Sequence, residues 1–252
     1  MLLHQIPAKP DYLRVKVWRR MQKIGAVTIK NSAWVLPASE EALEDFQWLI
    51  GEIEADGGEA LVCETRFLTG LTADQIRILA KVPMTPNAAT AMPTQAHAPD
   101  PTSAPPRGSV WVTRRGVYVD RIASAWLIRR FIDPEARFRF VPHRGYEPSP
   151  GEIRFDMYEA EYGHLGDSCT FEVLASTFVP GDAAIAALAE IVHDIDLKET
   201  RFGRPETAGV QLAVDGIAAA HASDPVRLER GAELFESLYA AFAARHDRGD
   251  PP

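Results

Sequence analysis

The sequence has little cysteine and no long apolar run, and each absence excludes a class of protein. Its two cysteines, Cys63 and Cys169, stand far apart among 252 residues, so the disulfide framework of a small secreted protein is excluded. No stretch approaches the ~20 consecutive apolar residues of a membrane-spanning helix. The first residues have neither the basic start nor the cleavage site of a signal peptide. We therefore expect a cytoplasmic protein with no membrane partner.

The common catalytic and nucleic-acid-binding motifs are absent as well. There is no G-x-G-x-x-G, Walker A, G-x-S-x-G or H-E-x-x-H sequence, which excludes the commonest nucleotide-dependent and hydrolytic enzymes. There is also no convincing helix-turn-helix, zinc finger or RNA-binding aromatic motif. Because the formal net charge is -8, indiscriminate binding to DNA is disfavoured. Any contact with DNA must then depend on a local patch of positive charge.

The composition predicts two domains. Residues 82–109 are rich in proline, alanine and small polar residues and have no hydrophobic periodicity, which is typical of a semi-extended linker. We predict an N-terminal domain over residues 1–81 and a C-terminal domain over residues 110–248. Both contain helical and strand patterns, so the predicted fold class is α+β.

The N-terminal domain is predicted to follow the order β-α-β-β-α-β. Leu13, Val17, Met21 and Ile24 recur at helical spacing, and Ser39 is a suitable N-cap for a second helix. Two short strands flank a hairpin turn at residues 30–31. This order is that of a ferredoxin-like sandwich. Because such sheets often expose edges that pair between chains, we also expect a homodimer.

The C-terminal domain is predicted to be mainly α-helical with a small β component. Strand patterns cover 110–119 and 135–142, and helical patterns cover 120–133, 170–178, 182–197, 208–221 and 224–246. The first of these helices is apolar on most sides, which is typical of a buried helix. Asp120 is its predicted N-cap.

The segment IVHDIDL places two aspartates at the C-terminal end of a helix, where the helix dipole favours cations. At ~100° per residue, His193 and Asp196 fall on or beside the apolar face, whereas Asp194 faces water. A carboxylate directed into the core is disfavoured unless a cation or strong donor compensates it. The alternative is that the helix ends by Leu197 and Asp196 caps the next turn.

A second group of polar residues lies in GHLGDSCTFEVL. His164, Cys169 and Glu172 stand within nine positions, and all three are metal donors. Taken singly, each has an ordinary explanation as a loop histidine, a buried thiol or a first-turn acid. Taken together with His193 and Asp196, they predict a site for a divalent transition metal ion, with Cys169 nearby.

Arginines surround the apolar helix of the C-terminal domain. Guanidinium groups suit tetrahedral oxyanions, and the candidates for such binding are Arg121, Arg114 and Arg115. The alternative is that they pair with acids or extend to solvent, and we favour this alternative for Arg129 and Arg130.

The N-terminal domain carries a local excess of positive charge. Residues 1–36 contain seven Lys or Arg and one acidic residue. Lys16, Arg19, Arg20 and Lys23 share the helix face opposite the apolar stripe, so they could follow the phosphates of operator DNA. A solvated surface is the alternative.

Several segments in the same order resemble ChrB-type chromate-resistance proteins. LRVKVWRRMQKIGAVTIKNSAWVLP is similar to their N-terminal domain. YVDRIASAWLIRRFIDP, GHLGDSCTFEVL and IVHDIDLK are similar to segments of their C-terminal domain. The resemblance implies a bacterial cytoplasmic protein that regulates a chromate-resistance operon in response to chromate and acts with a chromate efflux pump.

Three functions remain open from the sequence. The first is a regulator that senses chromate or a chromium species in its C-terminal domain and acts on operator DNA. The second is a metal-dependent redox or detoxifying enzyme. The third is an interaction module in which the acids and histidines are structural.

Overall fold

The computed structural model describes residues 1–7, 11–30, 32–67, 72–80, 105–142 and 145–248. Within these ranges the chain combines helices with an antiparallel and a parallel sheet, so the predicted α+β class is confirmed. The predicted linker lies largely outside the described residues, and the domain boundaries stay predictions. Two separate apolar clusters, one in each half of the chain, form the main cores.

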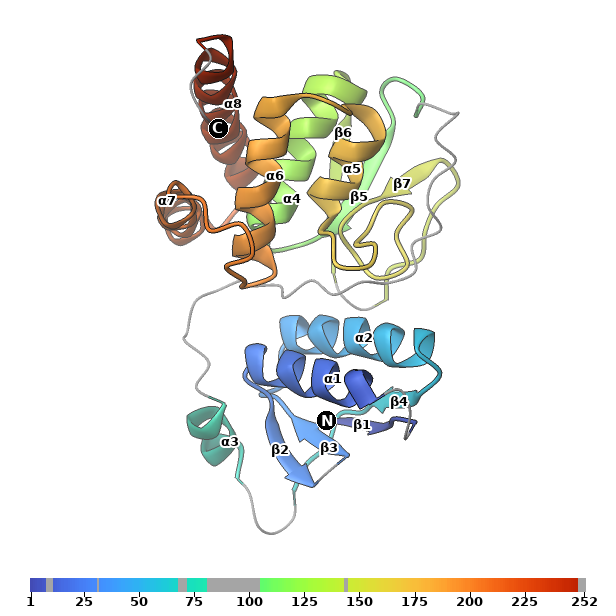
Figure 1. Ribbon diagram of the computed structural model, residues 1–252. Coiled ribbons are helices and arrows are strands. Elements are labelled where there is room, and N and C mark those ends of the chain that lie inside the picture. The colour runs from blue at the N-terminus through green and yellow to red at the C-terminus, as the bar shows by residue number, and fades with distance from the viewer. Residues whose placement is uncertain (8–10, 31, 68–71, 81–104, 143–144, 249–252) are drawn as a thin grey trace.

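The N-terminal half contains the predicted order of strands and helices. The elements are β1 (Leu2–Gln5), α1 (Asp11–Lys23), β2 (Val27–Lys30), β3 (Ala33–Val35), α2 (Glu40–Ala55) and β4 (Glu59–Val62), followed by α3 (Ala73–Leu79). The strands are antiparallel and lie in the order β2-β3-β1-β4. Helices α1 and α2 lie between this sheet and the C-terminal half (Figure 1).

Short-range sequence signals account for these helices. Leu13, Val17 and Met21 form the buried stripe of α1 and pack into one core with Trp48 of α2, as the spacing predicts. The Ser39 side chain accepts a hydrogen bond from the amide of Ala42 at 3.0 Å, so the predicted N-cap is confirmed.

The C-terminal half is mainly helical around a small parallel sheet. Its elements are β5 (Val110–Arg114), α4 (Val119–Leu127), a π-helical turn η1 (Ile128–Ile132), β6 (Arg137–Val141), β7 (Glu152–Arg154), α5 (Thr170–Phe178), α6 (Ala183–Asp196), α7 (Thr207–Ala220) and α8 (Asp224–Asp247). The strand order is β6-β5-β7, with both pairings parallel. Strand β7 and the parallel arrangement were not predicted from the sequence.

Helix α4 is the central element of this half. All nine of its residues are buried, and it contacts α5, α6 and α8 (Figure 1). The predicted burial is therefore confirmed, but the predicted cap is wrong. The helix begins at Val119 with Tyr118 in the N-cap position, so Asp120 lies inside the first turn and its side chain is directed into the core.

The topology brings two strand ends together. Because β5 and β7 are parallel neighbours, their carboxyl ends meet at one edge of the sheet, which is where α/β proteins commonly bind ligands. The chain runs from β5 into α4 and from β7 into Asp156. This edge therefore places Asp120 and Asp156 near each other.

Candidate metal centre

Three side chains of types that can bind a metal ion converge at this edge. Asp120 comes from α4, Asp156 follows β7, and His164 comes from the loop before α5. One ligand atom from each lies within 4.8 Å of the others, and all three residues are buried. His164 Nε2 lies 3.1 Å from Asp120 Oδ2 and 3.2 Å from Asp156 Oδ1. Asp196 Oδ2 is a fourth oxygen, 3.7 Å from the same nitrogen.

These separations fit a shared metal ion. Two ligand atoms at ~2.1 Å from a metal lie roughly 3.0–3.5 Å apart in octahedral or tetrahedral coordination. The separations between His164 Nε2 and the oxygens of Asp120 and Asp156 fall in that range. Carboxylate oxygen and imidazole nitrogen are donors that suit zinc, manganese and iron. The cluster could therefore hold a divalent ion with small side-chain movements.

Hydrogen bonds from neighbouring groups fix the carboxylates of Asp120 and Asp156 in place. The Asp120 carboxylate accepts hydrogen bonds from the amides of Thr170 and Phe171, at 2.9 and 2.8 Å, so it caps α5 and not its own helix. The Thr170 hydroxyl donates to Asp156 Oδ1 at 2.9 Å. Asp156 has a backbone φ of 45°, a left-handed conformation that Asp tolerates better than most residues. Outer contacts of this kind orient metal ligands.

The cluster holds more negative charge than its arginine can balance. Burial and the neighbouring Asp156 raise the pKa of Asp120 above its usual value. Burial would also raise the pKa of Asp156, but the charge of Arg121 and the hydrogen bond from His164 lower it to about 2. For His164, the hydrogen bonds to both acids outweigh burial and raise the pKa to about 10. A proton on His164 thus takes the place that a metal ion would occupy.

Of the two aspartates of IVHDIDL, Asp196 lies as predicted and Asp194 does not. Asp196 ends α6 and is only 5% exposed, as its predicted direction requires. Its Oδ2 has no hydrogen-bond partner among the described residues, and burial raises its pKa well above the usual value. Asp194 was predicted to face water, which is wrong. It is buried, and its carboxylate accepts hydrogen bonds from the amides of residues 201–203.

His193 and Glu172 form a separate contact beside the cluster. His193 Nδ1 and Glu172 Oε2 are 2.7 Å apart, and Glu172 also accepts a hydrogen bond from the Cys169 amide at 2.8 Å. His193 therefore faces Glu172, whereas Asp196 faces His164. Cys169 is fully buried, and burial raises the pKa of its thiol well above the usual value. The predicted five-residue ligand set is thus divided between two neighbouring groups.

The arginines predicted to bind an oxyanion have different surroundings. Arg121 is buried and its guanidinium contacts Glu44 Oε1 at 2.8 Å and Asp156 Oδ2 at 3.1 Å. Arg114 donates to the carbonyl of Pro142, and Arg115 is exposed. The donor fork of Arg121 is therefore already in use, and an oxyanion role for these residues stays a prediction.

The cluster is connected directly to the N-terminal half. Glu44 lies on α2, so its ion pair with Arg121 joins the two halves of the molecule. The ring of Trp48, also on α2, lies 5.4 Å from the ring of His164. A movement or change of charge at Asp156 or His164 therefore alters the contacts of α2.

The predicted DNA-binding face of α1 is less open than its spacing suggests. Lys16 pairs with Glu52 within the same half. Lys23 bonds to Glu199 of the C-terminal half at 2.5 Å. Arg20 is only 6% exposed, so its placement on a solvent face is wrong, while Arg19 is exposed. A DNA-binding role for these residues stays a prediction.

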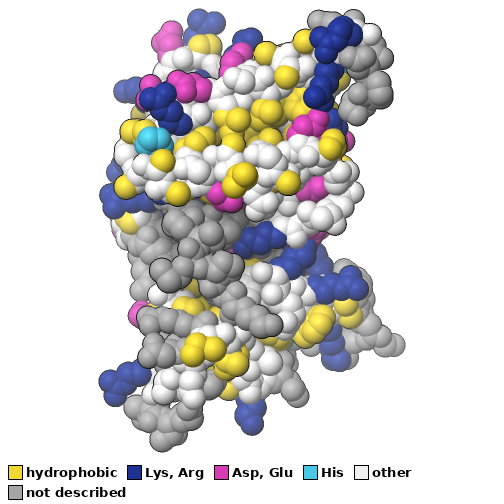
Figure 2. All heavy atoms as spheres, turned by 90° about the vertical axis from the view of Figure 1, so that its left-hand side faces the viewer, with side chains coloured by type: hydrophobic (Ala, Val, Ile, Leu, Met, Phe, Trp, Pro, Cys, Tyr) yellow, Lys and Arg dark blue, Asp and Glu magenta, His cyan; other side chains and the backbone are white. Residues whose placement is uncertain are grey.

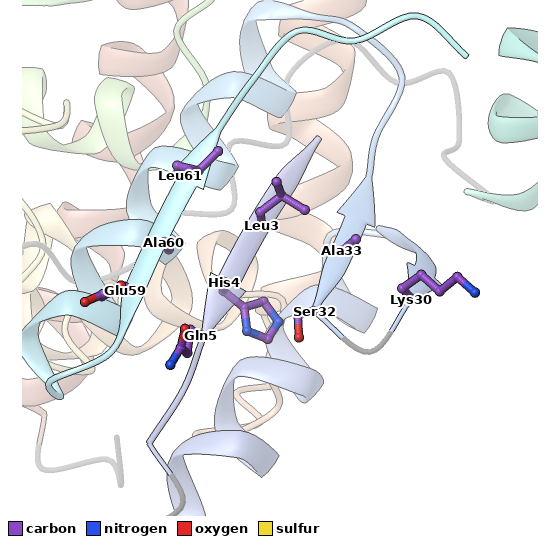
Figure 3. A pocket seen from close by; sticks show the side chains of 9 residues that line it. All are labelled: Leu3, His4, Gln5, Lys30, Ser32, Ala33, Glu59, Ala60 and Leu61. Carbon is purple, nitrogen blue, oxygen red and sulfur yellow. The ribbon is translucent and has the colours of Figure 1, made fainter. Parts of the chain in front are cut away.

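A shallow groove crosses the outer face of the N-terminal sheet (Figure 3). It is lined by Leu3, His4, Gln5, Lys30, Ser32, Ala33, Glu59, Ala60 and Leu61. Its one histidine and two charged side chains come from different strands and form no cluster of metal donors. The buried cluster around Asp120 is therefore a better candidate for a functional site than this groove.

Sequence reasoning missed two of the three clustered residues. The sequence pattern predicts a helix cap at Asp120, although an acid within a helix that is apolar on most sides also indicates a buried role. Asp156 was not identified because β7 has only three residues and gives no clear strand pattern. Recognition of β7 would have placed Asp156 at a strand end.

Among the described residues, no helix has the length and apolar character needed to cross a membrane. Two family models match the chain: "Protein ChrB, N-terminal" over residues 14–82 and "ChrB, C-terminal domain" over residues 111–242. A curated relative, Protein ChrB of Cupriavidus metallidurans, is 26% identical over 319 aligned residues, covering 98% of this chain and 96% of the relative. No solved structure matches the chain.

Proposed function

The chain belongs to the ChrB family, which is linked to chromate resistance, and from this premise we propose that it is a chromate-responsive regulator with a structural divalent metal ion. Asp120, Asp156 and His164 hold the ion, and Asp196 completes the site. The observation that carries the proposal is the convergence of three buried ligand atoms within 4.8 Å. One of these ligands, Asp156, also contacts Arg121, which reaches α2.

The metal ion explains the buried charge. Three carboxylates and one arginine share the cluster, and uncompensated buried charge is costly. A divalent ion supplies the missing positive charge and gives Asp196 Oδ2 a partner. The same ion fixes Asp156, and through Arg121 it stabilises one arrangement of the two halves. Operator DNA and chromate are then two ligands whose binding is linked through that arrangement.

The depth of the cluster favours a regulator over an enzyme. The exposed fractions of Asp120 and His164 are 1% each, whereas a catalytic metal keeps a position open to substrate. Cys169 is a poor redox group because a buried thiol with a raised pKa supplies little reactive thiolate. We therefore assign the ion a structural and conformational role.

The first prediction concerns the metal content. Protein purified without an affinity tag or chelator should contain about one divalent ion per chain, and elemental analysis measures it. Asp156→Asn and His164→Gln should each weaken binding by at least about 10- to 100-fold, because each removes a ligand or its charge. His193→Gln is the matched control, since His193 faces Glu172, and it should keep the ion. Metal lost equally from all three variants would reject the assigned ligands.

The regulatory part has its own test. Gel-shift or anisotropy measurements with the DNA upstream of the gene, at several chromate concentrations, should show an affinity that chromate changes. Neutralising Arg19 should reduce the salt dependence of that binding, because this side chain is exposed. If neither the chromate-free nor the chromate-bound protein binds the DNA, the regulator is rejected while the metal site stands.

The second prediction is that metal binding releases protons. Without the ion, His164 holds a proton with a pKa of about 10, and a metal requires the neutral nitrogen. The apparent affinity should therefore rise by about tenfold per pH unit between pH 6 and 9 if one proton is released. Calorimetric titration in two buffers with different heats of ionisation measures the released protons. An affinity independent of pH over this range would contradict a role for His164.

A further inference from the structure

A second cluster of charged groups lies where α1 meets the C-terminal end of α6. Arg20 and Lys23 come from α1, His193 comes from α6, and Glu199 follows α6. Lys23 Nζ donates to Glu199 Oε1 at 2.5 Å, and His193 Nε2 lies 3.8 Å from Glu199 Oε2. The Glu199 carboxylate therefore joins nitrogen atoms from both halves of the molecule. We call these four residues the α1–α6 cradle.

Two nitrogens of the cradle are buried and have no hydrogen-bond partner in the part of the chain that the structure describes. Arg20 is 6% exposed and His193 is fully buried. Among the described residues, neither Arg20 Nη1 nor His193 Nε2 has a hydrogen-bond partner. Asp167 lies 3.7 Å from the other terminal nitrogen of Arg20, and its side chain is 70% exposed. Buried polar atoms are nearly always paired, so both nitrogens point to a ligand.

Glu199 occupies the position of an anion in this cradle. Burial alone would raise the pKa of Glu199, but Lys23, Arg20 and His193 together lower it. Its ion pair with Lys23 is only partly buried, with side chains 30% and 29% exposed, and such pairs are weakly held. The carboxylate can therefore be displaced by a stronger anion.

We propose that the α1–α6 cradle binds a tetrahedral dianion, whose oxygens replace the Glu199 carboxylate against Lys23, Arg20 Nη1 and His193 Nε2. A guanidinium and an ammonium group are well suited to such an anion. Two negative charges match these nitrogens better than the single charge of Glu199. The nearby Glu172 does not oppose binding strongly, because it is already bonded to His193 Nδ1 and the Cys169 amide.

The dianion is identified as chromate on the basis of the proposed function, which this site would deepen. Because the nitrogens come from α1 and α6, a bound dianion would hold the two halves together and favour one arrangement of them. The face drawn in Figure 2 shows Lys and Arg side chains gathered at mid-height, where the two halves meet. An approaching anion would be attracted to such a region.

The test is calorimetric titration of the full-length protein with sulfate, phosphate and chromate as separate probes. Glu199→Gln removes the internal competitor, so it should bind sulfate about tenfold more tightly. Lys23→Gln should bind about tenfold more weakly, and its partly exposed side chain makes misfolding a small risk. Arg20→Gln should weaken binding as well. Glu161→Gln is the matched control, because Glu161 pairs with Arg154 elsewhere and should leave sulfate affinity unchanged.

The direction of the Glu199 effect decides the outcome. Weaker or unchanged binding in Glu199→Gln, or unchanged binding in Lys23→Gln, would overturn the proposed cradle. Tighter binding in Glu199→Gln together with weaker binding in Lys23→Gln supports the cradle, whichever of the three anions is used. A higher affinity for chromate than for sulfate and phosphate then identifies the ligand. If chromate binds the wild type and all of these variants with equal affinity, the cradle is rejected and the proposed function is not.

Discussion

Replacing Arg121 with methionine is expected to destabilise the protein by about 3–5 kcal/mol, because it leaves two buried carboxylates without their cation. The guanidinium of Arg121 contacts both Glu44 and Asp156, and all three side chains are at most 6% exposed. Methionine can fill the volume but supplies no charge or hydrogen bond. Ion pairs at the surface contribute only about 0–1 kcal/mol, so burial accounts for the size of the effect.

The measurement is urea unfolding of both proteins in the presence of a chelator, followed by tryptophan fluorescence. Arg230→Met is the control, since its pair with Glu233 is about half exposed, and it should change the free energy of unfolding by less than about 1 kcal/mol. A loss below about 1 kcal/mol for Arg121→Met would show that the ion pair between the halves contributes little.

The loss of stability in Arg121→Met should depend on pH and should decrease as the pH falls. In the wild type, the lowered pKa of Asp156, about 2, gives stability that is present above the unfolded pKa and is lost as the pH falls towards 2. Without Arg121 this contribution disappears, and burial already raises the pKa of Glu44. Protonation then relieves the unpaired charge. The difference between variant and wild type should therefore be smaller at pH 4 than at pH 7.

Features of the fold that depend on residues close together in the sequence could be predicted. Contacts between distant segments could not. The Ser39 cap and the buried stripe of α1 depend on residues three or four positions apart, and both are confirmed. The burial of Asp196 also followed from its position on a helix. By contrast, the two backbone amides that donate to Asp120 belong to residues 170 and 171. No local pattern connects positions that lie this far apart.

The misplaced role of Asp194 has a similar origin. Helical spacing directs its side chain away from the apolar stripe, as predicted, but the chain after α6 covers it. Lys198 has a left-handed backbone with φ of 52°, which turns the chain back so that the amides of residues 201–203 meet the Asp194 carboxylate. A positive φ at a lysine is not readable from composition, so the turn and the buried carboxylate were both missed.

Replacing Gly231 with alanine is expected to destabilise the protein by up to about 2 kcal/mol, although alanine is the better helix former. Gly231 lies in α8, and a Cβ there would come within 2.1 Å of Ile122 Cγ2 in α4. Alanine gains about 1 kcal/mol in helix propensity, whereas overpacking of a well-filled core costs about 1–3 kcal/mol. Ile122 is only 1% exposed and has little room to move, so the steric cost should exceed the gain.

Gly216→Ala, in the same half of the chain, is expected to change the stability of the protein in the opposite direction. Gly216 lies in α7, is exposed, and has no atom within 4 Å of an added Cβ, so only the propensity gain of about 0.5–1 kcal/mol applies. Thermal unfolding of the two variants should show a lower melting temperature for Gly231→Ala and a higher one for Gly216→Ala. Because Ile122 follows Arg121 in α4, displacement of that helix should also weaken metal binding in Gly231→Ala alone. Equal shifts in the two variants would show that α8 does not fix the position of α4 and its ligands.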